Sequence, residues 1–385
     1  MRRILVELDR ATSGTLVTIA AEGSGWAPSD ASLELALAHF DTQNLALPLH
    51  RLTSRVLMSH RLARFHVPDA RVWITRMAGR VVRNLRTKPD IIYSRSQPMS
   101  AALLARNLKR RLNIPWIMHL SDPWVENPHG GVASAHNIAD EADCFAQADR
   151  IALTTEGQAA HYRKKYPALA SKIIVSPNMM PDTQELERLR SAASSAASDD
   201  RLRLVFTGNL YGNRSPAPLI QAIEWLRATQ PQILSHLRID IYGHAQDEAR
   251  ALLERAADPL YYHGPVPFAQ AAAAQRGADI VISMEPIGDD PLAKCFLPSK
   301  VLECLAIEKP LLAITPEGSE VDRICREGYG WAISPALPEA IGACLAERIT
   351  QLYTLRNTPA KTAPERYQAH TVTRDLLVHM QQLIT

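Results

Sequence analysis

The stretch "FLPSKVLECLAIEKPLLAI", Phe296–Ile314, sets the pattern for the second half of the chain. A proline precedes an apolar helical pattern over Ser299–Ile307, and a Lys-Pro break then leads into a strand-like run that starts at Leu311. A helix followed directly by a buried strand is typical of a parallel sheet covered by helices. Glu303 is the one acid inside the helical pattern, at a position where a leucine would pack better. The stretch therefore predicts a fold class and also marks a candidate site.

The length and composition indicate two domains. At 385 residues the chain is too long for one ordinary core, and 46% of its residues are apolar and 22% are charged. No uninterrupted apolar run approaches ~20 residues, so we expect no transmembrane helix. Near the start, Glu7, Asp9 and Arg10 interrupt the apolar residues. This argues against a signal peptide and predicts a cytoplasmic protein.

The five cysteines are an odd number, are scattered along the chain and form no C-x-x-C pair. This pattern argues against a disulfide framework and against a zinc site. We interpret the cysteines as small buried apolar residues, namely Cys144, Cys295, Cys304, Cys325 and Cys344.

The net charge of +3 conceals a strongly basic segment. Between Arg51 and Arg111 there are fifteen lysines and arginines and only two acids, Asp69 and Asp90. Such a segment attracts polyanions. Aromatic residues are sparse there and no nucleic-acid-binding motif accompanies it, so we expect an anionic membrane surface and no nucleic acid as the partner. An ordinary solvated face is the alternative. The basic residues are Arg51, Arg55, Arg61, Arg64, Arg71, Arg76, Arg80, Arg83, Arg86, Lys88, Arg95, Arg106, Lys109, Arg110 and Arg111.

Strand-like apolar runs alternate with helix-period segments in both halves, which predicts two doubly wound α/β domains of Rossmann-like type. The expected strands are Thr15–Ala21, Ile91–Ser94, Trp116–Leu120, Arg150–Thr154 and Ile173–Val175, then Arg203–Thr207, Leu237–Tyr242, Tyr261–His263, Ile280–Met284, Leu311–Thr315 and Trp331–Ile333. The expected helices are Val72–Leu85, Ser100–Leu112, Ala217–Thr229, Asp247–Ala257, Phe268–Arg276, Ser299–Ile307, Pro338–Leu352 and a last one near Arg374–Ile384.

The domain boundaries follow from the changes in composition. We expect an N-terminal domain over residues 1–182, a Ser/Ala-rich surface linker over 183–200 and a C-terminal domain over 201–355. The helical segment 356–385 is expected to pack back on the N-terminal domain. Two such domains would leave a cleft between the carboxyl edges of their sheets, where folds of this kind bind ligands.

The second half opens with "LVFTGNLYGNRSPAPLIQAIEWL", Leu204–Leu226, which predicts a strand, a glycine-containing loop and a helix. Gly208 would allow a ligand to approach the backbone closely, and the amides at a helix N-terminus favour an anion. Arg214 adds a guanidinium group whose geometry suits phosphate oxygens. Strand-glycine-helix turns are also common in folds where they bind nothing.

The opening stretch provides the second part of this candidate site. Pro298 stands where the first turn of a helix begins, which would leave the amides near Ser299, Lys300 and Val301 free for an anion, and Lys300 adds a positive charge. Glu303 is four residues after Ser299, on the same helix face and one turn above the N-terminus. It could there accept hydrogen bonds from a ribose diol just beyond a diphosphate. The alternative is an acid that only stabilises the helix dipole.

Together these motifs resemble a known family. "LVFTGNLYGNR", "YYHGPVP", "ADIVISMEP" and "FLPSKVLECLAIEKPLLAI" are similar to the donor-binding half of GT-B glycosyltransferases of family 4. In the first half, "KPDIIYSRSQPMSAALLARNLKRRLNIPWIMHLSDPW", "ADRIALTTEGQAAHYRKKYP" and "IIVSPNMMPD" resemble the acceptor-side domain of that family and the start of its hinge. The resemblance covers roughly Asp90 to Ile333, with several motifs in the same order.

The resemblance implies a retaining transfer of a sugar from a nucleotide-sugar donor to an acceptor hydroxyl, with no metal or other cofactor. Arg214 and Lys300 would neutralise the departing diphosphate, and His119 and Asp122 of "HLSDPW" would orient the acceptor or the donor sugar. A histidine near a strand end is, on its own, as readily a structural residue. The donor-binding residues implied are Gly208, Asn209, Arg214, Gly264, Val266, Pro298, Ser299, Lys300 and Glu303.

Three features depart from the family pattern. A second glutamate is usual eight positions before Glu303, and Cys295 stands there. Many members have an arginine directly after the glycine of the first phosphate loop, where this chain has Asn209. In the family, a strand, a Gly-Gly loop and a helix come before the strand that corresponds to Thr15–Ala21. In this chain only fourteen residues come before it, and they read as the end of that helix. A misplaced start, a trimmed domain, or a shortened arrangement with Arg3–Leu8 as the first strand would each account for it.

The sequence thus predicts a glycosyltransferase of surface polysaccharide or glycolipid biosynthesis, cytoplasmic or peripheral on the inner face of the membrane, with a sugar or lipid-linked acceptor. Two alternatives remain. One is a non-catalytic GT-B-like protein that binds a nucleotide or a partner enzyme, which the cysteine at position 295 and the short N-terminus favour. The other is an epimerase on the same architecture.

Overall fold

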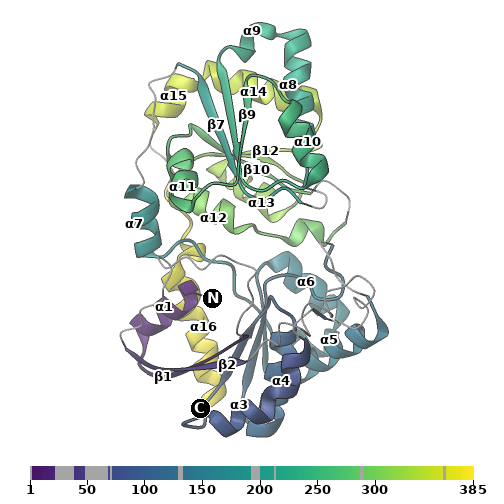
Figure 1. Ribbon diagram of the computed structural model, residues 1–385, viewed down its shortest axis with the longest axis vertical. Coiled ribbons are helices and arrows are strands. Elements are labelled where there is room, and N and C mark those ends of the chain that lie inside the picture. Colours follow the sequence, from purple (N-terminus) through teal and green to yellow (C-terminus); the bar gives the residue numbers. More distant parts are fainter. Residues whose placement is uncertain are drawn as a thin grey trace. The chain divides into compact units, whose positions relative to one another are not determined.

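The computed structural model describes residues 2–21, 39–47, 68–69, 72–128, 133–191, 200–211, 214–286, 290–358 and 361–385. The chain divides into two compact units: unit 1 is Met1–Asn178 with Ala369–Thr385, and unit 2 is Met179–Gln368. Within each unit, helices pack against parallel strands (Figure 1). No helix in the described ranges is long and apolar enough to cross a membrane.

Unit 1 contains a four-stranded parallel sheet in the order β3-β4-β5-β6 and a separate parallel pair, β1-β2. Its strands are β1 (Gly14–Ala21), β2 (Phe40–Leu47), β3 (Ile92–Arg95), β4 (Trp116–Leu120), β5 (Arg150–Leu153) and β6 (Ile173–Val175). Its helices are α1 (Arg2–Ala11), η3 (Val72–Met77), α3 (Ala78–Asn84), α4 (Ser100–Leu112), α5 (Ala135–Gln147), α6 (Glu156–Lys165), η4 (Pro167–Lys172) and α16 (Ala369–Ile384).

Unit 2 is built on a six-stranded parallel sheet in the order β12-β11-β10-β7-β8-β9. The strands are β7 (Leu202–Thr207), β8 (Leu237–Tyr242), β9 (Leu260–Gly264), β10 (Ile280–Met284), β11 (Leu311–Ile314) and β12 (Gly330–Ile333). The helices are α7 (Thr183–Ser191), α8 (Ala217–Thr229), α9 (Pro231–Leu234), α10 (Asp247–Arg255), α11 (Phe268–Arg276), η5 (Ala293–Cys295), α12 (Ser299–Ala306), α13 (Glu320–Ile324), η6 (Cys325–Tyr329), α14 (Pro338–Thr350), α15 (Leu352–Asn357) and η7 (Glu365–Tyr367). From β7 the chain runs first to one edge and then to the other, so the sheet is doubly wound.

The central strands explain why the fold could be predicted. Every residue of β4 and of β10 is buried, as expected for strands covered on both faces, whose sequences are continuous apolar runs. In the stretch Phe296–Ile314, α12 buries Val301, Leu302 and Leu305 in a core cluster that also contains residues of the sheet of unit 2. Strand β11 comes next in the chain after α12. The predicted α/β class with parallel sheets is confirmed.

The start of the chain is helical. Helix α1 spans Arg2–Ala11, buries Ile4 and Leu8 one turn apart, and packs on α16. This confirms that "RRILVELDRA" reads as a helix, and the alternative in which Arg3–Leu8 forms a strand is wrong. The 3.6-residue spacing of the apolar side chains explains the outcome.

Several boundaries differ from the prediction. The first part of the expected linker is helix α7, because Leu189 is buried and α7 packs on α11; residues 192–199 lie outside the described part. The expected helix at Val72–Leu85 begins as a 3-10 turn and becomes α-helical at Ala78. Unit 2 extends to Gln368, and α16 begins five residues before the predicted Arg374, at Ala369.

The cysteines are free thiols. Cys144, Cys304 and Cys325 are buried, as expected, whereas Cys295 and Cys344 are only partly buried.

Candidate functional site

A pocket lies in unit 2 between the adjacent parallel strands β7 and β10, the point where the strand order of the sheet reverses. Parallel strands end at the same edge, so the loops after β7 and β10 meet the start of α12 there. Four predicted donor-binding residues line the pocket, namely Gly208, Arg214, Pro298 and Lys300. Four polar lining residues were not predicted as site residues, namely Thr207, Gln275, Ser283 and Glu285.

The glycine loop after β7 is packed closely against the end of β8. The Gly208 amide donates to the Tyr242 carbonyl at 3.0 Å. A Cβ atom on Gly243, whose φ is +128°, would lie 1.8 Å from the Gly208 carbonyl oxygen, so only glycine fits there. The position of Gly208 at the pocket thus depends on a second glycine. Sequence analysis did not single out this second glycine, because it follows a different strand.

Arg214 is held by a buried carboxylate. Its Nη2 lies 2.9 Å from Glu285 Oε2, and the Ser283 hydroxyl donates to Glu285 Oε1 at 2.7 Å. The guanidinium carbon lies 5.4 Å from the centre of the Tyr211 ring. Burial raises the pKa of Glu285 above its ordinary value, while Arg214 and the Ser283 hydrogen bond act in the opposite direction. A guanidinium fixed in this way presents its other donors to the pocket.

Helix α12 brings a second cation to the same pocket. Lys300 Nζ lies 2.8 Å from Glu303 Oε2, one turn along the helix; the lysine side chain is 44% exposed and the carboxylate is 10% exposed. Pro298 is the N-cap residue and makes no side-chain cap. One part of the prediction is wrong: the Val301 amide is not free for an anion, because it donates to the Pro298 carbonyl at 3.1 Å.

The other predicted donor residues lie outside the pocket lining. Asn209 Oδ1 accepts from the His244 amide at 3.3 Å. The Gly264 carbonyl accepts from the Gly243 amide at 2.8 Å, and Val266 packs against the core of unit 2. Ser299 is exposed, and Glu303 pairs with Lys300, which itself lines the pocket.

Cys295, which occupies the position of the usual second glutamate, is a neutral thiol. Burial, followed by the nearby charge of Glu320, raises its pKa to about 11. Its Sγ donates to the Pro291 carbonyl at 3.3 Å. It therefore carries no charge near neutral pH and does not replace a carboxylate.

In unit 1, His119 and Asp122 lie at the carboxyl end of β4. Tyr93 OH lies 2.5 Å from His119 Nδ1, and His119 Nε2 is buried with no hydrogen-bond partner in the described ranges. Burial, helped by the charge of Arg95, holds the pKa of His119 well below its usual range, and burial raises the pKa of Tyr93 to about 12. The imidazole is therefore neutral, and if Tyr93 donates to Nδ1, Nε2 carries the proton.

Asp122 follows two residues after the end of β4. Gln97 Nε2 lies 3.4 Å from its Oδ2, and burial raises the pKa of Asp122, against the effect of the Arg95 charge. Arg95, at the end of β3, donates to Asn178 Oδ1 at 2.6 Å and to Ser121 Oγ at 3.3 Å. Tyr93 and Arg95 were missed by sequence analysis, although polar side chains at the end of a predicted strand were a usable signal.

Acidic side chains pair with part of the basic segment in the folded chain. Arg106 lies 2.9 Å from Asp140 and 2.8 Å from Asp143, Arg110 also pairs with Asp143 at 2.8 Å, and Lys109 pairs with Asp149. The acids come from α5 and the turn after it, which follow the segment in sequence. Arg51, Arg55, Arg61, Arg64 and Arg71 lie outside the described residues.

Within the described ranges, no group of three or more His, Cys, Asp or Glu side chains is placed to hold a metal ion. The predicted absence of a metal and of other cofactors stays a prediction.

Residues 2–179 match the family described as "Glycosyl transferase 4-like domain". The chain is 24% identical over 298 residues to the probable glycosyltransferase WbjE of Pseudomonas aeruginosa, covering 73% of this chain and 72% of that protein. It is 27% identical over 177 residues to D-inositol 3-phosphate glycosyltransferase of Streptomyces avermitilis, covering 44% of this chain. The match spans only 34% of the length of that relative.

Solved structures show the fold. An apo structure of OtsA has a TM-score of 0.68 at 14% identity and covers all of this chain and 96% of its own. The trehalose-6-phosphate structure from E. coli bound with UDP-2-fluoro glucose has a TM-score of 0.67 at 14% identity, with 99% and 95% covered. The chain is thus similar to GT-B glycosyltransferases of family 4, and its residues 2–179 match the glycosyl transferase 4-like domain.

Proposed function

We propose that the chain is a metal-independent, retaining glycosyltransferase that moves a sugar from a nucleotide-sugar donor to an acceptor hydroxyl. Its product would belong to surface polysaccharide or glycolipid biosynthesis. One observation carries the proposal: Arg214 and Lys300, which are far apart in sequence, line one pocket together with Gly208, at the point where the strand order of the sheet reverses. Open α/β sheets bind their ligands at this point.

The chemistry of the pocket fits a leaving diphosphate. When the bond between the anomeric carbon and the phosphate oxygen breaks, negative charge grows on the diphosphate, and two preorganised cations stabilise that charge in the transition state. Arg214 is suited to this role because Glu285 and Ser283 fix its orientation. Glu303, which pairs with Lys300, is the group proposed to accept hydrogen bonds from a ribose diol.

In unit 1, His119 and Asp122 are the groups proposed to orient the acceptor. A buried neutral imidazole with a free Nε2 can donate a hydrogen bond to a sugar oxygen. Asp122 has a raised pKa because it is buried, so it is a candidate to exchange a proton with a hydroxyl.

Association with an anionic membrane is a further part of the proposal. Exposed basic side chains remain on η3, α3, the loop after α3 and the end of α4, and in the described residues they have no acidic partner: Arg76, Arg80, Arg83, Arg86, Lys88 and Arg111. Co-sedimentation with vesicles of phosphatidylglycerol, compared with phosphatidylcholine, tests it. Binding to the anionic vesicles alone, lost at high salt, is expected; no binding to either kind contradicts it.

The two alternatives keep specific support. The neutral Cys295 favours a protein that binds nucleotide without transferring sugar. An epimerase is favoured only by the likeness to a putative UDP-N-acetylglucosamine 2-epimerase from Listeria monocytogenes, with a TM-score of 0.55 at 10% identity and 89% of this chain and 88% of that chain covered.

A product assay separates the three functions. The chain is incubated with UDP-, GDP- and dTDP-sugars, with and without a panel of sugar, sugar-phosphate and lipid-linked acceptors, and products are identified by mass spectrometry and NMR. Sugar transfer that depends on an acceptor, with the anomeric configuration kept, is expected. Nucleotide binding without product, or conversion of the donor sugar with no acceptor present, contradicts the proposal.

A further inference from the structure

The loop that follows Asp122 is fastened to two helices of unit 1. The Trp124 amide donates to the Tyr162 hydroxyl at 2.9 Å, and the Val125 amide donates to Glu141 Oε2 at 3.0 Å. The Trp124 indole donates to Asn137 Oδ1 at 2.8 Å. Two successive backbone amides and a side chain of this loop therefore depend on α5, which carries Asn137 and Glu141, and on α6, which carries Tyr162.

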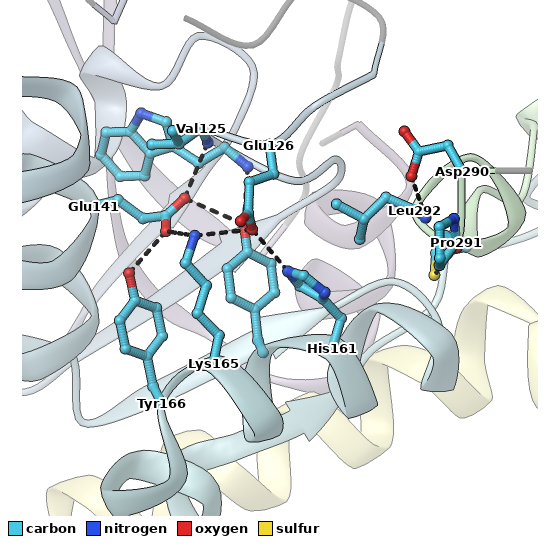
Figure 2. A network of polar contacts seen from close by, with 12 residues as sticks. Val125, Glu126, Glu141, His161, Lys165, Tyr166, Asp290, Pro291 and Leu292 are labelled. Carbon is cyan, nitrogen blue, oxygen red and sulfur yellow. Dashed lines mark hydrogen bonds and ion pairs between the residues drawn. The ribbon is translucent and has the colours of Figure 1, made fainter. Parts of the chain in front are cut away.

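The Glu141 carboxylate is the centre of this network. It is fully buried, and its Oε1 accepts from Lys165 Nζ at 2.6 Å and from the Tyr166 hydroxyl at 2.8 Å. Its Oε2 accepts from the Tyr162 hydroxyl at 3.3 Å as well as from the Val125 amide. Figure 2 shows Lys165, the last residue of α6, and Tyr166, which follows it, reaching this carboxylate, while Val125 meets it from the opposite side.

Lys165 keeps its charge and Tyr162 keeps its proton near neutral pH. Burial alone would lower the pKa of Lys165, but its hydrogen bonds to Glu141 and Glu126 outweigh burial and raise it. Burial, and then the Glu141 charge, raise the pKa of Tyr162 well above its usual value, so its hydroxyl keeps its proton. That hydroxyl can accept from the Trp124 amide while it donates to Glu141, which links the loop to the carboxylate.

A buried carboxylate is costly to leave unpaired, so Glu141 favours the positions of the Val125 amide and the Tyr162 hydroxyl in which both donate to its Oε2. We propose that Glu141 and Tyr162 are positioning residues for Asp122: they fix the amides of Trp124 and Val125 and so hold the loop that presents Asp122 to the acceptor. The inference rests on the proposed transferase function for its consequence, but not for the positioning itself.

Two hydroxyl deletions in the same network test the inference on the full chain. Tyr162→Phe removes the acceptor of the Trp124 amide and one donor to Glu141. Tyr166→Phe, the matched control, removes one donor to Glu141 only. Hydrogen exchange of the amides of Asp122, Trp124, Val125 and Glu126 is followed by mass spectrometry. We expect roughly fivefold or faster exchange in Tyr162→Phe, the effect of one lost hydrogen bond, and exchange close to wild type in the control.

The transfer assay supplies a functional measurement. With the donor and acceptor identified for the wild-type chain, Tyr162→Phe is expected to raise the acceptor KM several-fold and to leave the donor KM unchanged, whereas Tyr166→Phe changes neither. Two results overturn the inference. One is equal exchange of the loop amides in the two variants, and the other is an equal rise of the donor KM and the acceptor KM in Tyr162→Phe. A wild-type chain that transfers no sugar refutes the proposed function, while loop exchange still decides the positioning.

A second pair of variants covers the case in which Tyr162→Phe does not fold. Lys165→Met removes the counter-charge of Glu141. Glu126→Gln removes the exposed acid that pairs with Lys165 and His161 and leaves Glu141 and its counter-charge in place. Faster loop exchange in the first variant but not in the second supports the inference. Unchanged exchange in a folded Lys165→Met variant contradicts it.

Discussion

Arg214 Nη2 lies 2.9 Å from Glu285 Oε2, and the carboxylate is itself fixed by the Ser283 hydroxyl at 2.7 Å. The arginine follows β7 and the acid follows β10, so the two adjacent central strands of the sheet supply the two partners. A cation that is oriented before the substrate arrives needs no reorganisation when charge develops on a leaving group.

Removing Glu285 should impair turnover through Arg214. We expect Arg214→Ala to cost ~2–4 kcal/mol of transition-state stabilisation, Glu285→Ala a smaller part of this, and Glu285→Gln least, because its amide can still accept a hydrogen bond. The measurement is kcat/KM for transfer. The matched control is Glu254→Gln, whose pair with Arg250 spans the same 2.9 Å but is exposed. Equal losses in the Glu254 and Glu285 variants would show that the buried pair has no special role.

Lys300 and Glu303 should affect different kinetic constants. Glu303→Ala is expected mainly to weaken donor binding, because the carboxylate is assigned to the ribose, and Lys300→Ala is expected mainly to lower kcat. Titration of the donor by calorimetry and steady-state kinetics separate the two. Glu317→Ala, at a side chain 78% exposed, is the control. Unchanged turnover in both Arg214→Ala and Lys300→Ala rejects the assigned diphosphate site.

The raised pKa of Glu285 predicts an acidic limit to activity. As the pH falls through this pKa, the carboxyl takes up a proton and its ion pair with Arg214 is lost. The fall in kcat/KM should therefore begin above the ordinary glutamate pKa of 4.5. The pH profile of Glu285→Gln should lack this limb. A wild-type profile that stays flat down to that pKa would be inconsistent with the role given to Glu285.

His119 should make stability depend on pH. Its pKa is well below 6.5 in the folded chain and close to 6.5 when unfolded, so near pH ~6 the unfolded chain binds more protons. The free energy of unfolding should then fall as the pH decreases through the ordinary histidine value. His119→Asn should show a smaller fall between pH ~7.5 and ~5.5, measured by denaturant titration. Parallel curves for the two proteins would contradict a neutral buried imidazole.

Gly243 should be indispensable for the glycine loop. Gly243→Ala places a Cβ 1.8 Å from the Gly208 carbonyl oxygen, so the loop must move and donor affinity should fall. Gly318→Ala is the matched control, since its φ of +75° is also strained for alanine but no atom lies within 4 Å of the added Cβ. We expect the control to cost about 1 kcal/mol of stability with unchanged donor affinity. Equal donor affinity in both variants would argue against the close approach.

Most of the fold could be predicted from sequence because the buried parallel strands are continuous apolar runs with helical segments between them. The exceptions have local reasons. Helix α7 is mostly polar and leads directly into the Ser/Ala-rich run, and two leucines, Leu186 and Leu189, pack it on the rest of unit 2. Composition alone cannot reveal such a contact.

The site was only partly predictable. Arg214 and Lys300 were found because each stands beside a recognisable turn or helix start. Glu285 was missed because its role depends on the pairing of β7 with β10, which brings it to an arginine 71 positions away. For the same reason, the charge count over the basic segment overlooked Asp140 and Asp143, which neutralise Arg106 and Arg110 from another helix.

Calorimetric titration with UDP, GDP and dTDP tests the central claim most directly, that the pocket lined by Arg214 and Lys300 binds the diphosphate of a nucleotide-sugar. The wild-type chain should bind at least one of the three nucleotides, and Arg214→Ala and Lys300→Ala should each weaken that binding, whereas Glu254→Gln should not. Absence of binding by all three at millimolar concentration, or equal affinity in wild type and both cation variants, would contradict it.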